Sequence, residues 1–352
     1  MKHIVVKALS VLSILAQAGV ALANPFEPGW VLEAEQSALR FTSVKQGSII
    51  ETSSFATYTG VIDPTGRAEI KVLTDSVDTK IDLRNVRMRF LFFETFKYPE
   101  ATVTLQLQED MISDLPDIRR KVLTIPIDVT LLDTTQTIAA EFAVTLLSDD
   151  LVAVSSSTPI TIALEDFNLN LGREKLEEAA GVSIVPSATV TFDFVFSRLP
   201  DAGGAALSAT STADGRQLAR LSALETQGDF SRDECAGRFE ILSRSGNIYF
   251  STGSAQLRPE SDAILESITD IIARCPDLRI EISGHTDSDG SSALNQRLSE
   301  RRAGSVIAYF DENGISSDRL VAVGAGEENP VAPNDTAADK QKNRRIEFRL
   351  LN

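Results

Sequence analysis

Histidine, cysteine and tryptophan are scarce in this chain of 352 residues, which contains two histidines, two cysteines and one tryptophan. We expect His3 to be removed with an N-terminal signal peptide, so a Ser-His-Asp triad or a multi-histidine metal site would have to be built around His285 alone. The scarcity argues against both kinds of site. We therefore expect a protein that is not an enzyme and has no cofactor, and we interpret His285 as a structural loop residue.

A surplus of positive charge is absent as well. Acidic residues number 50 and basic residues 34, and the formal net charge is −16. Neither half of the chain presents the basic field that nucleic acid or an anionic membrane surface requires. The charge predicts solubility and excludes nucleic acid as a partner.

The first 23 residues predict a secretory signal peptide. Lys2 and Lys7 precede an apolar stretch that ends in the small-residue pattern Ala21-Leu22-Ala23. This stretch is too short to favour a membrane-spanning helix. We expect cleavage after Ala23 and a mature periplasmic chain without a transmembrane segment.

Cys235 and Cys275 are the cysteines of the chain, and both belong to its C-terminal part. An even pair in an exported chain predicts a disulfide, which would close a loop of roughly 40 residues and stabilise the fold by about 4 kcal/mol. The alternative is two buried free thiols.

Composition divides the chain into four parts. After the signal peptide (1–23) we expect a first domain (24–199), a linker (200–228) and a second domain (229–352). The linker is rich in small residues and poor in apolar ones, which indicates flexibility, and a short helix is expected at 217–226.

Alternation of apolar and polar residues dominates the first domain, which predicts half-buried antiparallel strands and an all-β sandwich or barrel. The alternating segments are 67–73, 101–108, 123–131, 138–146 and 188–196. Segment 83–93 interrupts this pattern with arginines and bulky apolar residues, and we expect it to form a helical crossing segment.

Seven groups of residues in this domain resemble the YceI-like family. They are Trp30-Val-Leu, Ser43-Val-Lys45, Tyr58-x-Gly60-x-Ile62, Ser76-Val-Asp78-Thr79, Arg84-Asn-Val-Arg87-Met-Arg89-x-x-Phe92-Phe93, Lys97-Tyr98-Pro99 and the terminal strand. The resemblance covers 25–199. It implies a lipocalin-like antiparallel barrel whose apolar interior holds a polyisoprenoid chain.

The alternating residues would serve equally well as a filled core. Where many members of the family have a histidine, this chain has Arg87. Arg84, Arg87 and Arg89 could offer cations to a phosphate head group at the barrel mouth. Alternatively they pair with Asp78 and Asp82 on the surface, which is the interpretation we favour.

The second domain alternates strands and helices. We expect a strand at 240–250, a helix at 259–275, a strand at 278–283, a helix at 292–312 and strands at 319–324 and 345–350, with a loop between Gly326 and Asn343. The apolar face of the first helix and the glycine at position 314, after the second, support this order.

Asp287 and Arg302 are the candidate binding residues. Asp287 can accept hydrogen bonds from an ammonium group, and the planar fork of Arg302 can hold a carboxylate, each charge-assisted bond contributing roughly 1.5–3 kcal/mol. A zwitterion is the natural ligand of such a pair. The alternative is that the two side chains pair with each other to brace the loop against the helix.

The same stretch resembles the OmpA-like peptidoglycan-binding domain. The matching motifs are Ile248-Tyr-Phe-Ser, Gly284-His-Thr-Asp287, Asn295-x-x-Leu298-Ser299-x-x-Arg302-Ala303, Gly314-Ile315, Gly324-x-Gly326 and Asn343-Arg344-Arg345-Ile346-Glu347. The resemblance implies a βαβαββ fold that binds the diaminopimelate of the peptidoglycan stem peptide through Asp287 and Arg302.

Other residues complete the expected site. Thr286, Asn295 and Leu298 belong to it, with Thr286 and Asn295 interpreted as shaping the loop. The run Asn343-Arg344-Arg345 could form a second basic rim, but we interpret it as a solvated face.

These features together predict a non-enzymatic periplasmic binding protein, associated with the cell wall or outer membrane. Its second domain would bind peptidoglycan and its first an isoprenoid-like lipid, with envelope proteins as further partners. One alternative is a wall-associated scaffold whose barrel is filled and mediates protein contacts. Another is an enzyme that acts on the wall.

Overall fold

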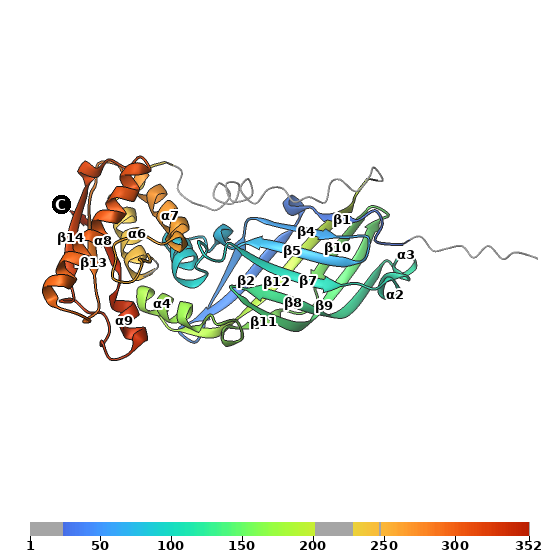
Figure 1. Cartoon of the computed structure of the whole chain (residues 1–352). Helices are drawn as coiled ribbons and strands as arrows, with labels where there is room; N and C mark the ends of the chain where they lie inside the picture. The colour runs from blue at the N-terminus through green and yellow to red at the C-terminus, as the bar shows by residue number, and fades with distance from the viewer. Residues whose placement is uncertain (1–23, 201–227, 246–247, 352) are drawn as a thin grey trace, which may run out of the picture.

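The computed structural model describes residues 24–200, 228–245 and 248–351, which form two domains placed end to end (Figure 1). The expected signal peptide and the expected helix at 217–226 lie outside the described residues, as does almost all of the expected linker. Among the described residues, no helix combines the length and apolar character needed to cross a membrane.

The N-terminal domain is a closed antiparallel barrel of eight strands, several of which are interrupted. β1 and β2 together form one interrupted barrel strand and β3 and β4 form the next, because β1 pairs with β4 and β2 pairs with β3. The long strand β12 closes the barrel, because it pairs with β1 and β2 on one side and with β10 and β11 on the other. The strands are β1 (Trp30–Leu32), β2 (Ala38–Lys45), β3 (Ile49–Phe55), β4 (Tyr58–Ile62), β5 (Arg67–Leu73), β6 (Val77–Asp78), β7 (Glu100–Gln106), β8 (Arg120–Leu131), β9 (Thr134–Ser148), β10 (Leu151–Ser156), β11 (Ile160–Ala163) and β12 (Ile184–Arg198).

Alternation in the sequence produces the two faces of this barrel. In β8 the buried Ile125, Ile127 and Val129 alternate with exposed neighbours. Successive side chains of a strand point to opposite faces, so one face lines the interior and the other meets water. Four of the five alternating segments lie within observed strands, and the fifth, 101–108, overlaps β7 and runs two residues past its end.

Short helices cover both ends of the barrel. At one end lie α2 (Glu109–Ile112) and α3 (Leu115–Ile118). The opposite end carries α1 (Asp82–Arg87), the π-helix η3 (Met88–Phe92) and α4 (Asn170–Ala180), and Figure 1 shows this end facing the second domain. The expected helical segment at 83–93 is confirmed.

The C-terminal domain packs helices against a three-stranded sheet of order β14-β13-β15, in which β13 and β14 are parallel and β15 is antiparallel. Its elements are α6 (Arg232–Ser245), α7 (Asp262–Ala273), β13 (Arg279–His285), α8 (Ser292–Glu312), β14 (Leu320–Gly326), α9 (Ala337–Asn343) and β15 (Ile346–Leu351).

Two local predictions for this domain are wrong. The segment expected as a strand at 240–250 is helical up to Ser245, and among its described residues beyond the helix the only strand-like pairing is an isolated bridge from Phe250 to Leu257. The helix buries Phe239, Ile241 and Leu242, so its apolar residues serve packing against β15 and the barrel. The expected loop 326–343 ends in α9, whose first turn is capped by the side chain of Thr336.

Covalent and steric constraints hold the second domain together. The predicted disulfide is present and joins Cys235 of α6 to Cys275, which follows α7. At Gly284 a Cβ atom would lie 2.2 Å from the carbonyl oxygen of Ser299. Only glycine permits this approach of β13 to α8, which brings the loop after β13 beside the helix that carries Arg302.

The two domains share one hydrophobic cluster. Phe90, Leu91 and Phe93 of the barrel domain belong to the same buried cluster as Phe239 and Leu242 of α6. Helix α6 contacts both α1 and η3. The second domain is thus packed on the helical end of the barrel.

Candidate functional site

The barrel encloses a cavity of about 520 Å³ with an almost wholly apolar lining. Ile70, Val103, Val129 and Phe194 are among the strand residues that face it. Cavities of ~300–1,000 Å³ are typical of small-molecule sites. The interior is therefore not filled by its own side chains, which removes the filled-core alternative.

The three arginines proposed for a head group do not line this cavity. Arg84 pairs instead with Glu51 at 3.0 Å. The expected surface pairing is also wrong for both carboxylates, because Asp78 pairs with Lys80 and Asp82 with Arg238 of the second domain.

The charged residues that do line the cavity are at the end that carries α2 and α3. They are Glu109, Asp149 and Arg198, and Arg198 also lies over the ring of Trp30, 4.3 Å from its centroid. At the opposite end the lining residues Phe55 and Phe93 are apolar, with ring centroids 5.8 Å apart. The charged side chains of the cavity lining are thus those at its α2–α3 end.

A second cavity, of about 480 Å³, lies in the C-terminal domain and brings the predicted site residues together. Unlike the first, it is lined largely by polar groups. Its lining comprises Ile248, Tyr249, Phe250, Thr252, Gly253, Arg258, His285, Thr286, Asp287, Asp289, Asn295, Leu298, Arg302, Gln341, Arg344 and Arg345.

Asp287 lies in the loop between β13 and α8, and its side chain is 11% exposed. One carboxylate oxygen accepts a hydrogen bond from the backbone N–H of Asp289 at 3.1 Å. The other accepts from Nη1 of Arg344 at 2.5 Å. An ionised carboxylate offers about four acceptor positions, so roughly two remain for a ligand.

Arg302 projects from α8 into the same cavity and is buried. Its Nε donates to the carbonyl oxygen of Ser254 at 3.0 Å, and its guanidinium lies 5.1 Å from the ring centroid of Phe250. Burial, and then the charge of Arg344, lower the pKa of Arg302. Within the described residues Arg302 pairs with no carboxylate, so the alternative of an Asp287–Arg302 brace is wrong.

The remaining predicted residues surround this pair. Asn295 donates from Nδ2 to the backbone oxygen of Asp287 at 3.3 Å and to Glu327, which holds the loop in place. The N–H of Thr286 donates to Gly326 at 2.9 Å, while its buried hydroxyl has no hydrogen-bond partner among the described residues. Leu298 forms part of the wall.

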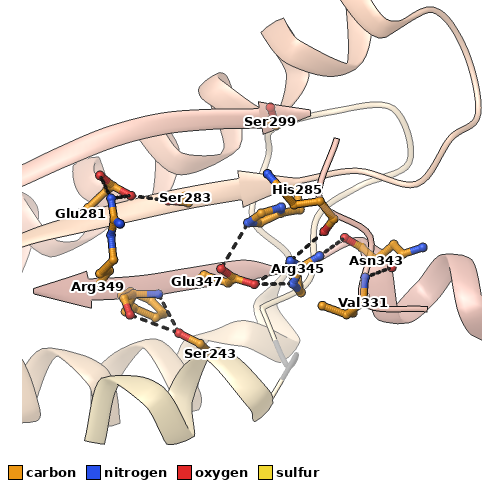
Figure 2. Close-up of polar contacts among 12 residues, drawn as sticks. Ser243, Glu281, Ser283, His285, Ser299, Val331, Asn343, Arg345, Glu347 and Arg349 are labelled. Carbon is orange, nitrogen blue, oxygen red and sulfur yellow. Dashed lines mark hydrogen bonds and ion pairs between the residues drawn. The ribbon is translucent and has the colours of Figure 1, made fainter. Parts of the chain in front are cut away.

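The basic run 343–345 is largely buried, so its interpretation as a solvated face is wrong. Asn343 holds the preceding loop, accepting from the N–H groups of Val331 and Ala332 at 2.8 and 3.0 Å. Arg345 is 8% exposed and binds Glu347 (Figure 2). Arg344, which sequence reasoning did not assign to the site, donates a hydrogen bond to Asp287. The basic run 343–345 was the feature of the sequence that could have indicated this role.

His285 ends β13 beside this network. Its Nε2 lies 3.5 Å from a carboxylate oxygen of Glu347 (Figure 2). The contact with His285, and then the charge of Arg345, lower the pKa of Glu347 to about 2. This network joins β13 to β15, and its members His285 and Arg345 line the polar cavity.

Family models match both halves of the chain. Residues 30–196 match the YceI-like domain, and residues 249–344 match the OmpA family. The chain joins a YceI-like domain to an OmpA-family domain. The matched regions coincide with the barrel and with the domain that contains the polar cavity.

Curated relatives match the OmpA-family domain. The peptidoglycan-binding protein ArfA of Mycobacterium tuberculosis is 40% identical over 103 residues, which is 29% of this chain and 32% of that protein. The probable lipoprotein YiaD of Escherichia coli is 36% identical over 110 residues, 31% of this chain and 50% of that protein. This chain therefore spans a third to a half of the length of these relatives.

A solved structure resembles the YceI-like domain. A polyisoprenoid-binding domain from Saccharophagus degradans is 28% identical and covers 48% of this chain and 98% of its own, with a TM-score of 0.45.

Proposed function

We propose that this protein is a periplasmic, non-enzymatic carrier that binds peptidoglycan through its OmpA-family domain and an isoprenoid-like lipid in its YceI-like barrel. The observation that carries the wall-binding half is Arg302. A buried guanidinium without a carboxylate partner is unfavourable, so the site is completed by an anionic group from a ligand. The peptidoglycan-binding relative supports the identity of that ligand.

The stem peptide's diaminopimelate fits the chemistry of the cavity. Its carboxylate would accept two hydrogen bonds from Arg302, and its ammonium would donate to the free acceptor positions of Asp287. Thr286 would supply a hydroxyl to the same ligand. In this arrangement Arg344 holds Asp287 in place without occupying all of its acceptor positions.

The lipid-binding half rests on the apolar cavity. Each buried methylene favours binding by about 0.8 kcal/mol, so a long unbranched or isoprenoid chain needs no polar contact in the interior. The Saccharophagus degradans domain, described as polyisoprenoid binding, indicates the class of chain.

The test of wall binding is co-sedimentation of the mature protein with insoluble peptidoglycan. Asp287→Ala and Arg302→Ala should each weaken binding roughly 10- to 100-fold, because each removes a charge-assisted contact of about 1.5–3 kcal/mol. Arg301→Ala is the matched control, since Arg301 is the exposed neighbour on the same helix. Equal sedimentation of all the variants would refute the proposed site, and release of soluble wall fragments would refute the non-enzymatic role.

A further inference from the structure

The end of the barrel next to the second domain is closed by residues that also pack against that domain. Phe55 and Phe93 line the lipid cavity, and they also pack in the cluster that contains Phe239 and Ile248 of the OmpA-family domain. Ile248 in turn lines the polar cavity. One continuous apolar cluster therefore extends from the inner end of the lipid cavity to a wall of the peptidoglycan cavity.

The segment Ile248–Phe250 forms part of that wall, and Ile248 and Phe250 pack in the apolar cluster shared with the barrel. Phe250 lies under the guanidinium of Arg302. Burial, and then the carboxylate of Glu94 in the barrel domain, raise the pKa of the neighbouring Tyr249. The surroundings of Arg302 thus depend on a segment that the barrel supports.

A buried ion pair joins the two domains at this interface. Arg238 of α6 is fully buried, and its one carboxylate partner among the described residues is Asp82 of α1. Its guanidinium also lies 3.6 Å from the ring centroid of Phe230. A docked arrangement that left this cation buried without Asp82 would be unfavourable, so the pair selects the arrangement in which the two charges meet.

Gly237 gives the interface its close fit. A Cβ at this position of α6 would lie 2.9 Å from Cδ1 of Leu83 in the barrel domain. Glycine is unfavourable inside a helix compared with alanine. Its presence there permits the side chain of Leu83 to reach the helix backbone.

We propose that docking of α6 on the barrel end links the two binding sites, so that a lipid in the barrel strengthens the binding of peptidoglycan. This inference rests on the proposed function. An empty cavity leaves Phe55 and Phe93 without contacts on one side, whereas a bound chain supplies them. The bound chain therefore stabilises the docked end of the barrel, which supports Ile248–Phe250 and Arg302. By thermodynamic reciprocity, wall binding strengthens retention of the lipid.

The experiment is a calorimetric titration of the full chain with a purified muropeptide that carries a diaminopimelate stem. The protein is compared empty and loaded with geranylgeraniol, a single-chain isoprenoid alcohol. The loaded protein should bind the muropeptide about five-fold more tightly or better, the lower end of common coupling strengths.

Two variants separate the domains by different means. Asp82→Ala removes the counter-charge of Arg238, and Gly237→Leu inserts a side chain against Leu83. Both should lengthen the particle in small-angle X-ray scattering and reduce the loaded-to-empty affinity ratio to about one. Glu178→Ala is the matched control, because it removes the exposed interdomain pair with Arg244, and it should keep the wild-type ratio.

The outcomes distinguish the linkage from the proposed function. If the wild-type protein binds both ligands but binds the muropeptide equally tightly with and without lipid, the linkage alone is refuted. If scattering shows that the domains of a variant have separated and the loaded-to-empty affinity ratio is still that of the wild type, transmission through this interface is refuted. Failure of both wild-type forms to bind the muropeptide refutes wall binding, and the linkage with it.

Discussion

Substitution of Ala101 tests whether the barrel is hollow. A larger side chain at this position should raise the free energy of unfolding if the cavity is empty and lower it if the interior is filled. Ala101 lies on β7 opposite Val72 and lines the apolar cavity of the barrel. Ala101→Leu adds three carbon atoms, worth about 0.8 kcal/mol each when buried, against a loss of rotamer freedom of about 0.5–1 kcal/mol. In an empty cavity the free energy of unfolding should rise by about 1.5–2 kcal/mol.

The matched control is the same substitution in a packed part of the interior. Ala140 of β9 is 2% exposed and belongs to a hydrophobic cluster, but it does not line the cavity. Ala140→Leu should therefore destabilise the barrel by about 1–3 kcal/mol, the usual cost of overpacking.

The assay is denaturant unfolding of delipidated protein followed by tryptophan fluorescence. Trp30 is the one tryptophan of the chain and is buried in the barrel, so the signal reports this domain. When the same fluorescence is followed on heating, the melting temperature should be higher by roughly 3 to 8 °C for Ala101→Leu. The same substitution should also weaken lipid binding. A loss of stability as large as that of Ala140→Leu would refute the open cavity.

Three further predictions concern the OmpA-family domain. Replacement of Cys235 and Cys275 by serine should lower its free energy of unfolding by about 4 kcal/mol, since the disulfide closes a loop of 40 residues. Glu347 has a folded pKa of about 2, below its ordinary 4.5, so its stabilising effect is present above pH 4.5 and is lost as the pH falls through 2. The side chain of Glu347 is 39% exposed, so Glu347→Gln should lower the free energy of unfolding by about 1 kcal/mol at neutral pH. The free energy of unfolding of this variant should also fall less steeply at acid pH. Gly284→Ala should cost about 3 kcal/mol or more in chemical denaturation, because the new Cβ would meet the backbone of Ser299.

Controls exist within the same domain. Gly304 is a helical glycine with open space around its Cβ position, so Gly304→Ala should be neutral or stabilise by up to about 1 kcal/mol. Equal stability of the two glycine variants would contradict the packing argument. An unchanged acid limb in Glu347→Gln would show that this carboxylate does not govern the profile, and serine variants as stable as wild type would contradict the disulfide's contribution.

Local patterns were sufficient to predict much of the architecture. Alternation of period two identified the barrel strands, because a half-buried strand must place every second side chain in the apolar interior. The motif around Gly284 and the spacing from Asp287 to Arg302 placed both residues at one site. The prediction succeeded because a strand, a loop and the following helix fix that geometry within a short stretch of chain.

Contacts between distant residues decided the rest. No local pattern distinguishes an apolar strand face that fills a barrel from one that lines a cavity, because this depends on the sum of side-chain volumes across eight strands. The pairing of Arg344 with Asp287 joins positions 57 residues apart. The pairing of Arg238 with Asp82 joins positions 156 residues apart, in different domains. By itself the sequence determined the barrel strands, the disulfide and two of the polar residues that line the cavity of the second domain. The tertiary structure alone decided that the barrel is hollow, that Arg302 is left without a carboxylate partner among the described residues, and that the two domains are docked, since each depends on which surfaces meet when the chain folds.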